Sequence, residues 1–170
     1  MDGILIINKK ENMTSRDVVN IVSKKLHTKK VGHTGTLDPM AKGVLVVAVN
    51  KALKLVDDIT SLNKEYIAEV TLGIKTDTLD ITGNILEKYD VKSIDKEKLE
   101  TILKSFIGKY DMEVPIYSAV KVNGKKLYEY AREGKKVELP RKIVYINSIE
   151  LLNVNGNKFT FKCNVNKWYL

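Results

Sequence analysis

The chain has 170 residues, of which 44% are hydrophobic and 29% are charged, so its composition excludes an intrinsically disordered protein. This length is sufficient for one domain with a substantial hydrophobic core. Lysine and arginine together number 29 against 21 aspartates and glutamates, and the formal net charge of +8 favours a polyanionic partner such as nucleic acid.

Other classes of protein are also excluded. No apolar run approaches the length of a membrane span, and the N-terminus lacks the basic and apolar regions of a signal peptide, so we expect a cytoplasmic protein that does not bind membranes. Cys163 is the only cysteine and there are only two histidines, which predicts no internal disulfide and no metal site. The sequence has no phosphate-binding glycine motif, so no cofactor is expected.

The N-terminal residues predict a strand followed by a helix. Residues 3–8 are apolar and β-branched, as is typical of a buried strand. Either Thr14 or Ser15 can serve as the N-cap of the helix that follows. Apolar residues then recur at helical spacing and should form its buried face: Val18, Val19, Ile21, Val22 and Leu26.

The central feature of the sequence is residues 31–43. Three glycines and a proline in this span predict a loop of fixed shape between two buried elements, the second of which is a strand at residues 44–49. Asp38 precedes Pro39, which disfavours the helical conformation and holds Asp38 in an extended backbone. On spacing alone, a tight turn in which the carboxylate bonds only to the backbone is the commoner explanation.

The full sequence of this loop favours a different explanation for Asp38. Residues 32–39 read Gly-His-Thr-Gly-Thr-Leu-Asp-Pro, and this string resembles the catalytic loop of the TruB-type tRNA pseudouridine-55 synthases. The resemblance continues in order to about Cys163, and it implies that Asp38 is the counterpart of the family's essential catalytic aspartate. It also implies that His33 fills the space left by a target base flipped out of the RNA, while a turn-stabilising hydrogen bond is the alternative role for His33.

Residues 64–66 resemble a second family motif, Lys-x-Tyr, whose tyrosine stacks on the target base. The resemblance implies this role for Tyr66, with Lys64 contacting RNA beside it; an ordinary core aromatic at the start of a strand is the alternative. Alternating residues from 66 to 72 predict a half-buried strand. Residues 73–83 are expected to form a polar loop.

A helix is predicted at residues 94–110, followed by a segment rich in lysine, arginine and tyrosine. Residues 115–134 read as a strand, an Asn-Gly turn and a short helix, and they resemble the family's Tyr-Ser-Ala, Leu-Tyr and Ala-Arg-x-Gly pattern. Basic residues suit phosphates, and aromatic faces suit unstacked bases. The predicted RNA-binding cations are Lys9 (in the family's Lys-Pro motif, where Lys10 replaces the proline), Lys64, Lys121, Lys125, Lys126 and Arg132.

The last residues depart from the family pattern. After the strand expected at residues 159–165, the family continues with Ser-Lys-Gly-Thr-Tyr-Ile-Arg, which supplies an arginine partner for the aspartate. Here Lys167 precedes Trp-Tyr-Leu. One base inserted before the codons GGT ACT TAT would convert Gly-Thr-Tyr into Trp-Tyr-Leu, so we hypothesise a frameshift in the gene or its recorded sequence. Residues 1–170 are then expected to form a single, incomplete catalytic domain that lacks the family's C-terminal RNA-binding module.

The resemblance implies an α+β fold in which a mixed, largely antiparallel sheet is flanked by helices. It implies an isomerase that converts uridine to pseudouridine at position 55, in the T-arm of tRNA. The alternative is a non-catalytic RNA-binding remnant of such an enzyme. We expect tRNA as the partner and predict no obligatory protein partner.

Overall fold

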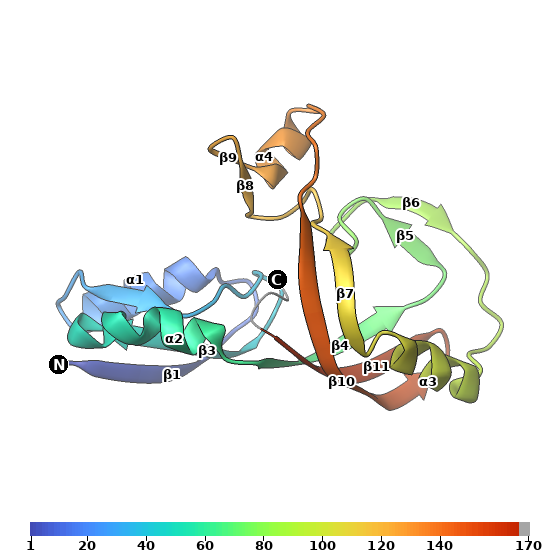
Figure 1. Ribbon diagram of the computed structural model, residues 1–170, viewed down its shortest axis with the longest axis horizontal. Coiled ribbons are helices and arrows are strands. Elements are labelled where there is room, and N and C mark those ends of the chain that lie inside the picture. The colour runs from blue at the N-terminus through green and yellow to red at the C-terminus, as the bar shows by residue number, and fades with distance from the viewer. Residues whose placement is uncertain (167–170) are drawn as a thin grey trace. The chain divides into compact units, whose positions relative to one another are not determined.

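The computed structural model describes residues 1–166 (Figure 1). They belong to two compact units, which are described separately below. The predicted α+β class is confirmed, and every strand pair in the described residues is antiparallel. The expected single catalytic domain stays a prediction, and the segment from Lys167 onward, for which a frameshift is hypothesised, lies outside the described residues.

The first unit, Met1–Leu62, contains a three-stranded sheet with the order β1-β3-β2. The register pairs Lys9 at the end of β1 with Gly43 at the start of β3. The loops that follow β1 and precede β3 therefore lie at the same end of this sheet. The elements in chain order are β1 (Gly3–Lys9), α1 (Ser15–Lys25), β2 (Val31–His33), β3 (Gly43–Val49), the 3-10 helix η1 (Asn50–Leu55) and α2 (Val56–Ser61).

The core of the first unit lies between α1 and one face of the sheet. Val18 and Val22 of α1 pack against buried side chains of β3, and Leu5 and Ile7 of β1 join them. The prediction of a buried strand at residues 3–8 is correct for the strand but wrong for burial, because Ile6 is 74% exposed. Successive strand residues point to opposite faces, and α1 covers only one of them.

In the second unit, the described residues from Asn63 to 166 contain a four-stranded sheet with the order β4-β11-β10-β7 and two short ribbons, β5-β6 and β8-β9. Figure 1 shows α3 beside this sheet, where it contacts β10. The elements in chain order are β4 (Lys64–Thr71), β5 (Ile74–Thr76), β6 (Ile85–Lys88), α3 (Lys96–Ser105), β7 (Gly108–Glu113), β8 (Lys121–Val122), β9 (Lys125–Lys126), α4 (Leu127–Arg132), β10 (Arg141–Asn155) and β11 (Lys158–Val165).

Two apolar clusters hold the second unit together. Leu99 and Leu103 of α3 pack against Phe159 of β11. At the other end of β11, Cys163 and Val165 form a second cluster that half-buried Tyr66 and other apolar side chains join. Burial of these side chains is the main force that keeps α3 and the strands β4, β10 and β11 together.

Three predicted boundaries are wrong. The helix predicted at residues 94–110 ends at Ser105, because Gly108 has φ +112°, a conformation that favours glycine, and begins β7. The loop predicted at residues 73–83 contains β5, and the loop predicted at residues 31–43 begins with β2. No helix in the part of the chain that the structure describes is long and apolar enough to cross a membrane.

Candidate active site

Asp38 lies on the loop between β2 and β3, and its side chain is exposed. The residue before it is tied to α1: the Ser15 hydroxyl accepts a hydrogen bond from the Leu37 N–H (2.9 Å) and donates one to the Leu37 carbonyl (3.3 Å). The Asp38 carbonyl accepts a hydrogen bond from the Ala41 N–H (3.0 Å), which closes the turn after it. The loop therefore presents an exposed carboxylate on a backbone that is held in place.

Lys9 supports the other side of the same loop. Its ammonium donates hydrogen bonds to the carbonyls of Lys10 (3.0 Å), Met13 (2.8 Å) and Pro39 (3.4 Å). The Pro39 carbonyl also accepts the Asn12 N–H (2.8 Å). The RNA contact predicted for Lys9 requires an exposed ammonium, whereas this side chain is only 1% exposed. Lys9 therefore connects β1 to the Asp38 loop through these hydrogen bonds.

His33 is the last residue of β2 and pairs with Val47 of β3. Its Nδ1 atom is buried and has no hydrogen-bond partner among the described residues. Buried polar atoms in proteins are nearly always paired, so the unpaired ring nitrogen at the start of the Asp38 loop is an exception. Thr34, which follows, is fixed at both ends: its N–H donates to the Val46 carbonyl (3.0 Å), and its carbonyl accepts the Thr60 hydroxyl (2.8 Å).

Lys64 and Tyr66 lie at the start of β4 in the second unit. Tyr66 is half-buried and pairs with Cys163 across the sheet. Burial lowers the pKa of the half-buried Lys64, which makes its charged form less favourable than in water. The structure thus divides the candidate residues: Lys9, His33 and Asp38 belong to the first unit, and the others to the second.

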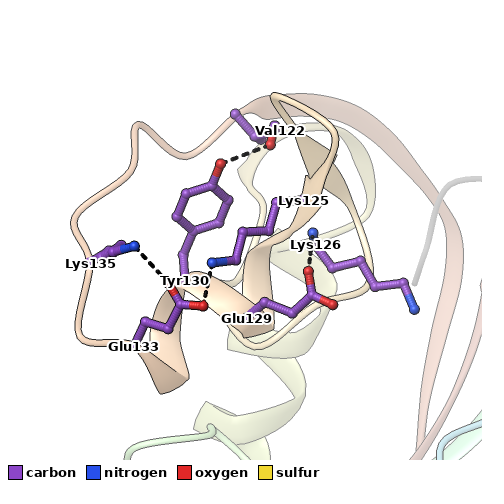
Figure 2. A network of polar contacts seen from close by, with 7 residues as sticks. All are labelled: Val122, Lys125, Lys126, Glu129, Tyr130, Glu133 and Lys135. Carbon is purple, nitrogen blue, oxygen red and sulfur yellow. Dashed lines mark hydrogen bonds and ion pairs between the residues drawn. The ribbon is translucent and has the colours of Figure 1, made fainter.

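The strand, Asn-Gly turn and short helix predicted for the basic segment at residues 115–134 are confirmed as β8, the turn after it and α4, and an unpredicted strand, β9, pairs with β8. Figure 2 shows its polar contacts: Glu133 bonds to Lys125 (2.5 Å) and Lys135 (3.0 Å). These hydrogen bonds, from Lys125 first and then from Lys135, hold the pKa of the Glu133 carboxyl below its ordinary value. The charge of Lys125 is therefore paired within the segment, a contact that the sequence does not reveal. The Tyr130 hydroxyl donates to the Val122 carbonyl (3.1 Å) and ties α4 to β8.

A second aromatic residue of α4 carries two cations. The Lys126 ammonium and the Arg132 guanidinium each lie 5.3 Å from the centre of the Tyr128 ring. Arg132 and Lys121 are exposed, and Lys126 is half-buried. This cluster combines positive charge with a π-face, which is the combination that single-stranded nucleic acid binds.

No group of three or more histidine, cysteine, aspartate or glutamate side chains in residues 1–166 is placed to hold a metal ion. Asp77 and Asp80, which the sequence pairs on one loop, accept hydrogen bonds from their neighbours instead. Asp77 accepts the backbone and side-chain N–H groups of Asn84 (2.8 and 3.0 Å). Asp80 accepts the hydroxyls of Thr78 (2.8 Å) and Thr82 (2.6 Å). Both carboxylates therefore shape the turn.

Sequence comparison gives close relatives over nearly the whole chain. It is 46% identical to tRNA pseudouridine synthase B of Fusobacterium nucleatum, over 98% of this chain and 58% of that protein. It is 50% identical to tRNA pseudouridine synthase B of Bacillus subtilis, over 89% of this chain and 49% of that protein. The chain spans about half the length of the curated relatives it matches.

Solved structures agree with the fold. A chain in the crystal structure of a Cbf5-Nop10-Gar1 complex superposes with a TM-score of 0.71 and 27% identity, over 99% of this chain and 40% of that chain. A chain of an H/ACA RNP bound to a substrate RNA containing 2'-deoxyuridine shares the fold with a TM-score of 0.68, at 23% identity.

A sequence-family model described as "TruB family pseudouridylate synthase (N terminal domain)" matches residues 23–168. This match covers most of the chain, including the loop that carries Asp38 and the basic segment that ends in α4. The chain therefore belongs to the TruB family of pseudouridylate synthases.

Proposed function

We propose that the protein converts uridine to pseudouridine in the T-arm of tRNA, with Asp38 as the catalytic carboxylate. The observation that carries this proposal is the exposed Asp38 side chain on a loop whose backbone is bonded on both sides of the residue. The relatives named tRNA pseudouridine synthase B support the substrate.

The reaction makes limited demands on the protein. The bond between N1 of uracil and C1′ of the ribose breaks, the base turns, and C5 bonds to C1′ in its place. N1 gains a proton and C5 loses one, so the reaction is an isomerisation without net oxidation. An ionised carboxylate serves it either by adding covalently to the sugar or base or by removing a sugar proton.

RNA recognition in this proposal begins with the target uridine. The target base is stacked in the folded arm and must be flipped out before Asp38 can act on the nucleotide. We assign Tyr66 to stacking on that base and half-buried His33, at the end of β2, to the space it leaves. The cluster at Tyr128 supports contacts from Lys126 and Arg132 to RNA.

The remaining cations have smaller roles in the proposal. Exposed Lys121 and half-buried Lys64 contribute positive charge near the RNA, while Lys125 is paired with Glu133. Lys9 acts on the Asp38 loop rather than on RNA. We place the reaction in the cytoplasm, and we keep the prediction that tRNA is bound without an obligatory protein partner.

The test compares Asp38→Asn with the unaltered full-length gene product on a T-arm stem-loop labelled with tritium at C5 of the target uridine. Conversion releases tritium, and Asp38→Asn should abolish that release while RNA affinity stays within a few fold, because contacts to phosphates dominate affinity. Asp57→Asn, which changes an exposed aspartate of α2, is the matched control. Release by Asp38→Asn would refute the assignment, and an unaltered protein that binds the stem-loop without converting it would establish the non-catalytic alternative.

A further inference from the structure

Ser15 is a buried polar residue whose side chain does not cap its own helix. It is the first residue of α1, and its side chain is 2% exposed. Thr14 supplies the N-cap: its hydroxyl accepts the Asp17 N–H (3.1 Å), and its own N–H donates to the Asp17 carboxylate (2.8 Å). The sequence left Thr14 and Ser15 as equal candidates for the cap, and the choice of Thr14 leaves the Ser15 hydroxyl available for another contact.

That contact is with the residue before Asp38. The Ser15 hydroxyl accepts from the Leu37 N–H at 2.9 Å and donates to the Leu37 carbonyl at 3.3 Å, although the two residues are 22 positions apart. The Leu37 carbonyl belongs to the peptide bond that leads into Asp38. The Leu37 side chain also packs against the core of the first unit. One buried hydroxyl thus fixes the peptide groups on both sides of Leu37.

We infer that Ser15 is a positioning residue for Asp38: it sets the direction of the carboxylate through the Leu37 backbone and does not itself touch the substrate. This inference rests on the proposed catalytic role of Asp38. Without the hydroxyl, the Leu37 N–H and carbonyl would both lose their partner, and the loop would move to find water or other partners. A displacement of a catalytic group by about 1 Å can cost on the order of a hundredfold in rate.

A positioning role predicts a particular kinetic signature. In the full-length gene product, Ser15→Ala should lower kcat on the T-arm stem-loop by roughly 10- to 100-fold. KM should stay within about twofold, because the phosphate contacts that dominate RNA affinity are unchanged. Ser15→Thr, which keeps the hydroxyl, should recover most of the rate.

Ser23→Ala is the matched control, because it removes another α1 hydroxyl that bonds to a carbonyl, that of Thr28 (2.5 Å), at the far end of the helix. If Ser15 only stabilised the fold, Ser15→Ala and Ser23→Ala would both lower the melting temperature and leave kcat of the folded protein unchanged. A kcat for Ser15→Ala within twofold of the unaltered protein would overturn the inference, as would a rate loss that Ser15→Thr does not reduce.

A measurement on the unaltered protein covers the case in which Ser15→Ala does not fold. Amide hydrogen exchange should be slower at Leu37 than at Thr36 by about tenfold or more after correction for intrinsic rates, since the Leu37 N–H is bonded to a buried hydroxyl. Equal exchange at the two amides would overturn the inference. If Asp38→Asn is inactive and Ser15→Ala fully active, only the role of Ser15 fails; if Asp38→Asn is active, the proposed function fails.

Discussion

The buried ammonium of Lys9 donates a hydrogen bond to the carbonyl of Pro39, 3.4 Å away, and so connects the end of β1 to the residue after Asp38. Two further carbonyls, of Lys10 and Met13, complete its coordination. A cation in this position is held by dipoles rather than by a carboxylate. Removing the ammonium would leave the carbonyls of Lys10, Met13 and Pro39 without this hydrogen-bond donor.

Lys9→Met should therefore make the folded protein less stable. The substitution keeps the length of the side chain but removes the ammonium, and it should lower the free energy of unfolding by about 2 kcal/mol. Urea denaturation measures this, with exposed Lys10→Met as the control. The salt dependence of RNA affinity should not change. An unchanged stability, together with a salt slope reduced by about one, would instead identify Lys9 as a phosphate contact.

Substitutions in the cluster of Tyr128, Lys126 and Arg132 should separate the contributions of charge and of stacking to RNA affinity. Arg132→Ala should weaken T-arm affinity by roughly three- to tenfold and reduce the salt slope by about one, because it removes a proposed phosphate contact. Tyr128→Leu should weaken affinity while leaving the slope unchanged, because stacking does not release counterions. Lys125→Ala should have the smallest effect, since Glu133 already pairs its charge. Equal salt slopes for all three variants would contradict this division.

Asp80 predicts a pH dependence of stability. Burial alone would raise its pKa, but the hydrogen bonds from Thr82 and Thr78 outweigh burial and hold the pKa below the ordinary value of 3.8. A carboxylate with a lowered pKa stabilises the fold above its ordinary pKa, and this contribution is lost as the pH falls through the folded-state value.

Thermal melts of the unaltered protein and Asp80→Asn should therefore differ most near neutral pH, and the difference should shrink as the pH falls below 3.8. Asp90→Asn, at an exposed residue outside the turn, should show no such convergence. A melting-temperature difference that stays constant from pH 7 to pH 3 would mean that the bonds to Asp80 do not stabilise the turn.

Cys163 should be a slow-reacting thiol. It is buried beside Val165 in the second apolar cluster of the second unit, and burial raises its pKa, which lowers the fraction of reactive thiolate. Alkylation by iodoacetamide at pH 8 should be at least roughly tenfold slower in the native protein than in urea, since both access and thiolate are limited. Equal rates in the two states would show that the strand pairing of β11 opens readily.

Local sequence chemistry was sufficient to predict several elements. The turn between β8 and β9 follows from Asn-Gly, because Asn123 and Gly124 have φ of +52° and +80°, which these two residue types tolerate best. The strand β3 follows from an apolar run of six residues, whereas β11 was expected from the family resemblance. The exposed loop around Asp38 follows from its glycines and proline.

Other features depend on contacts between distant parts of the chain. The strands β2 and β5 have three residues each, which is too short to show a period of two. The link from Ser15 to Leu37 and the burial of Lys9 involve partners that only the fold brings together. For Lys9, a family motif identified the residue, but the charge of the side chain suggested a surface role that its carbonyl partners exclude.

The bonds that fix the Asp38 loop also determine when its conformational entropy is lost. Ser15 and Lys9, two residues of the chain itself, hold the backbone before and after Asp38. The loop therefore gives up its freedom when the chain folds, and under the proposed function the free energy of RNA binding would not be consumed in ordering it. Interactions with the remote parts of a tRNA arm would then be available for taking the target base out of its stack.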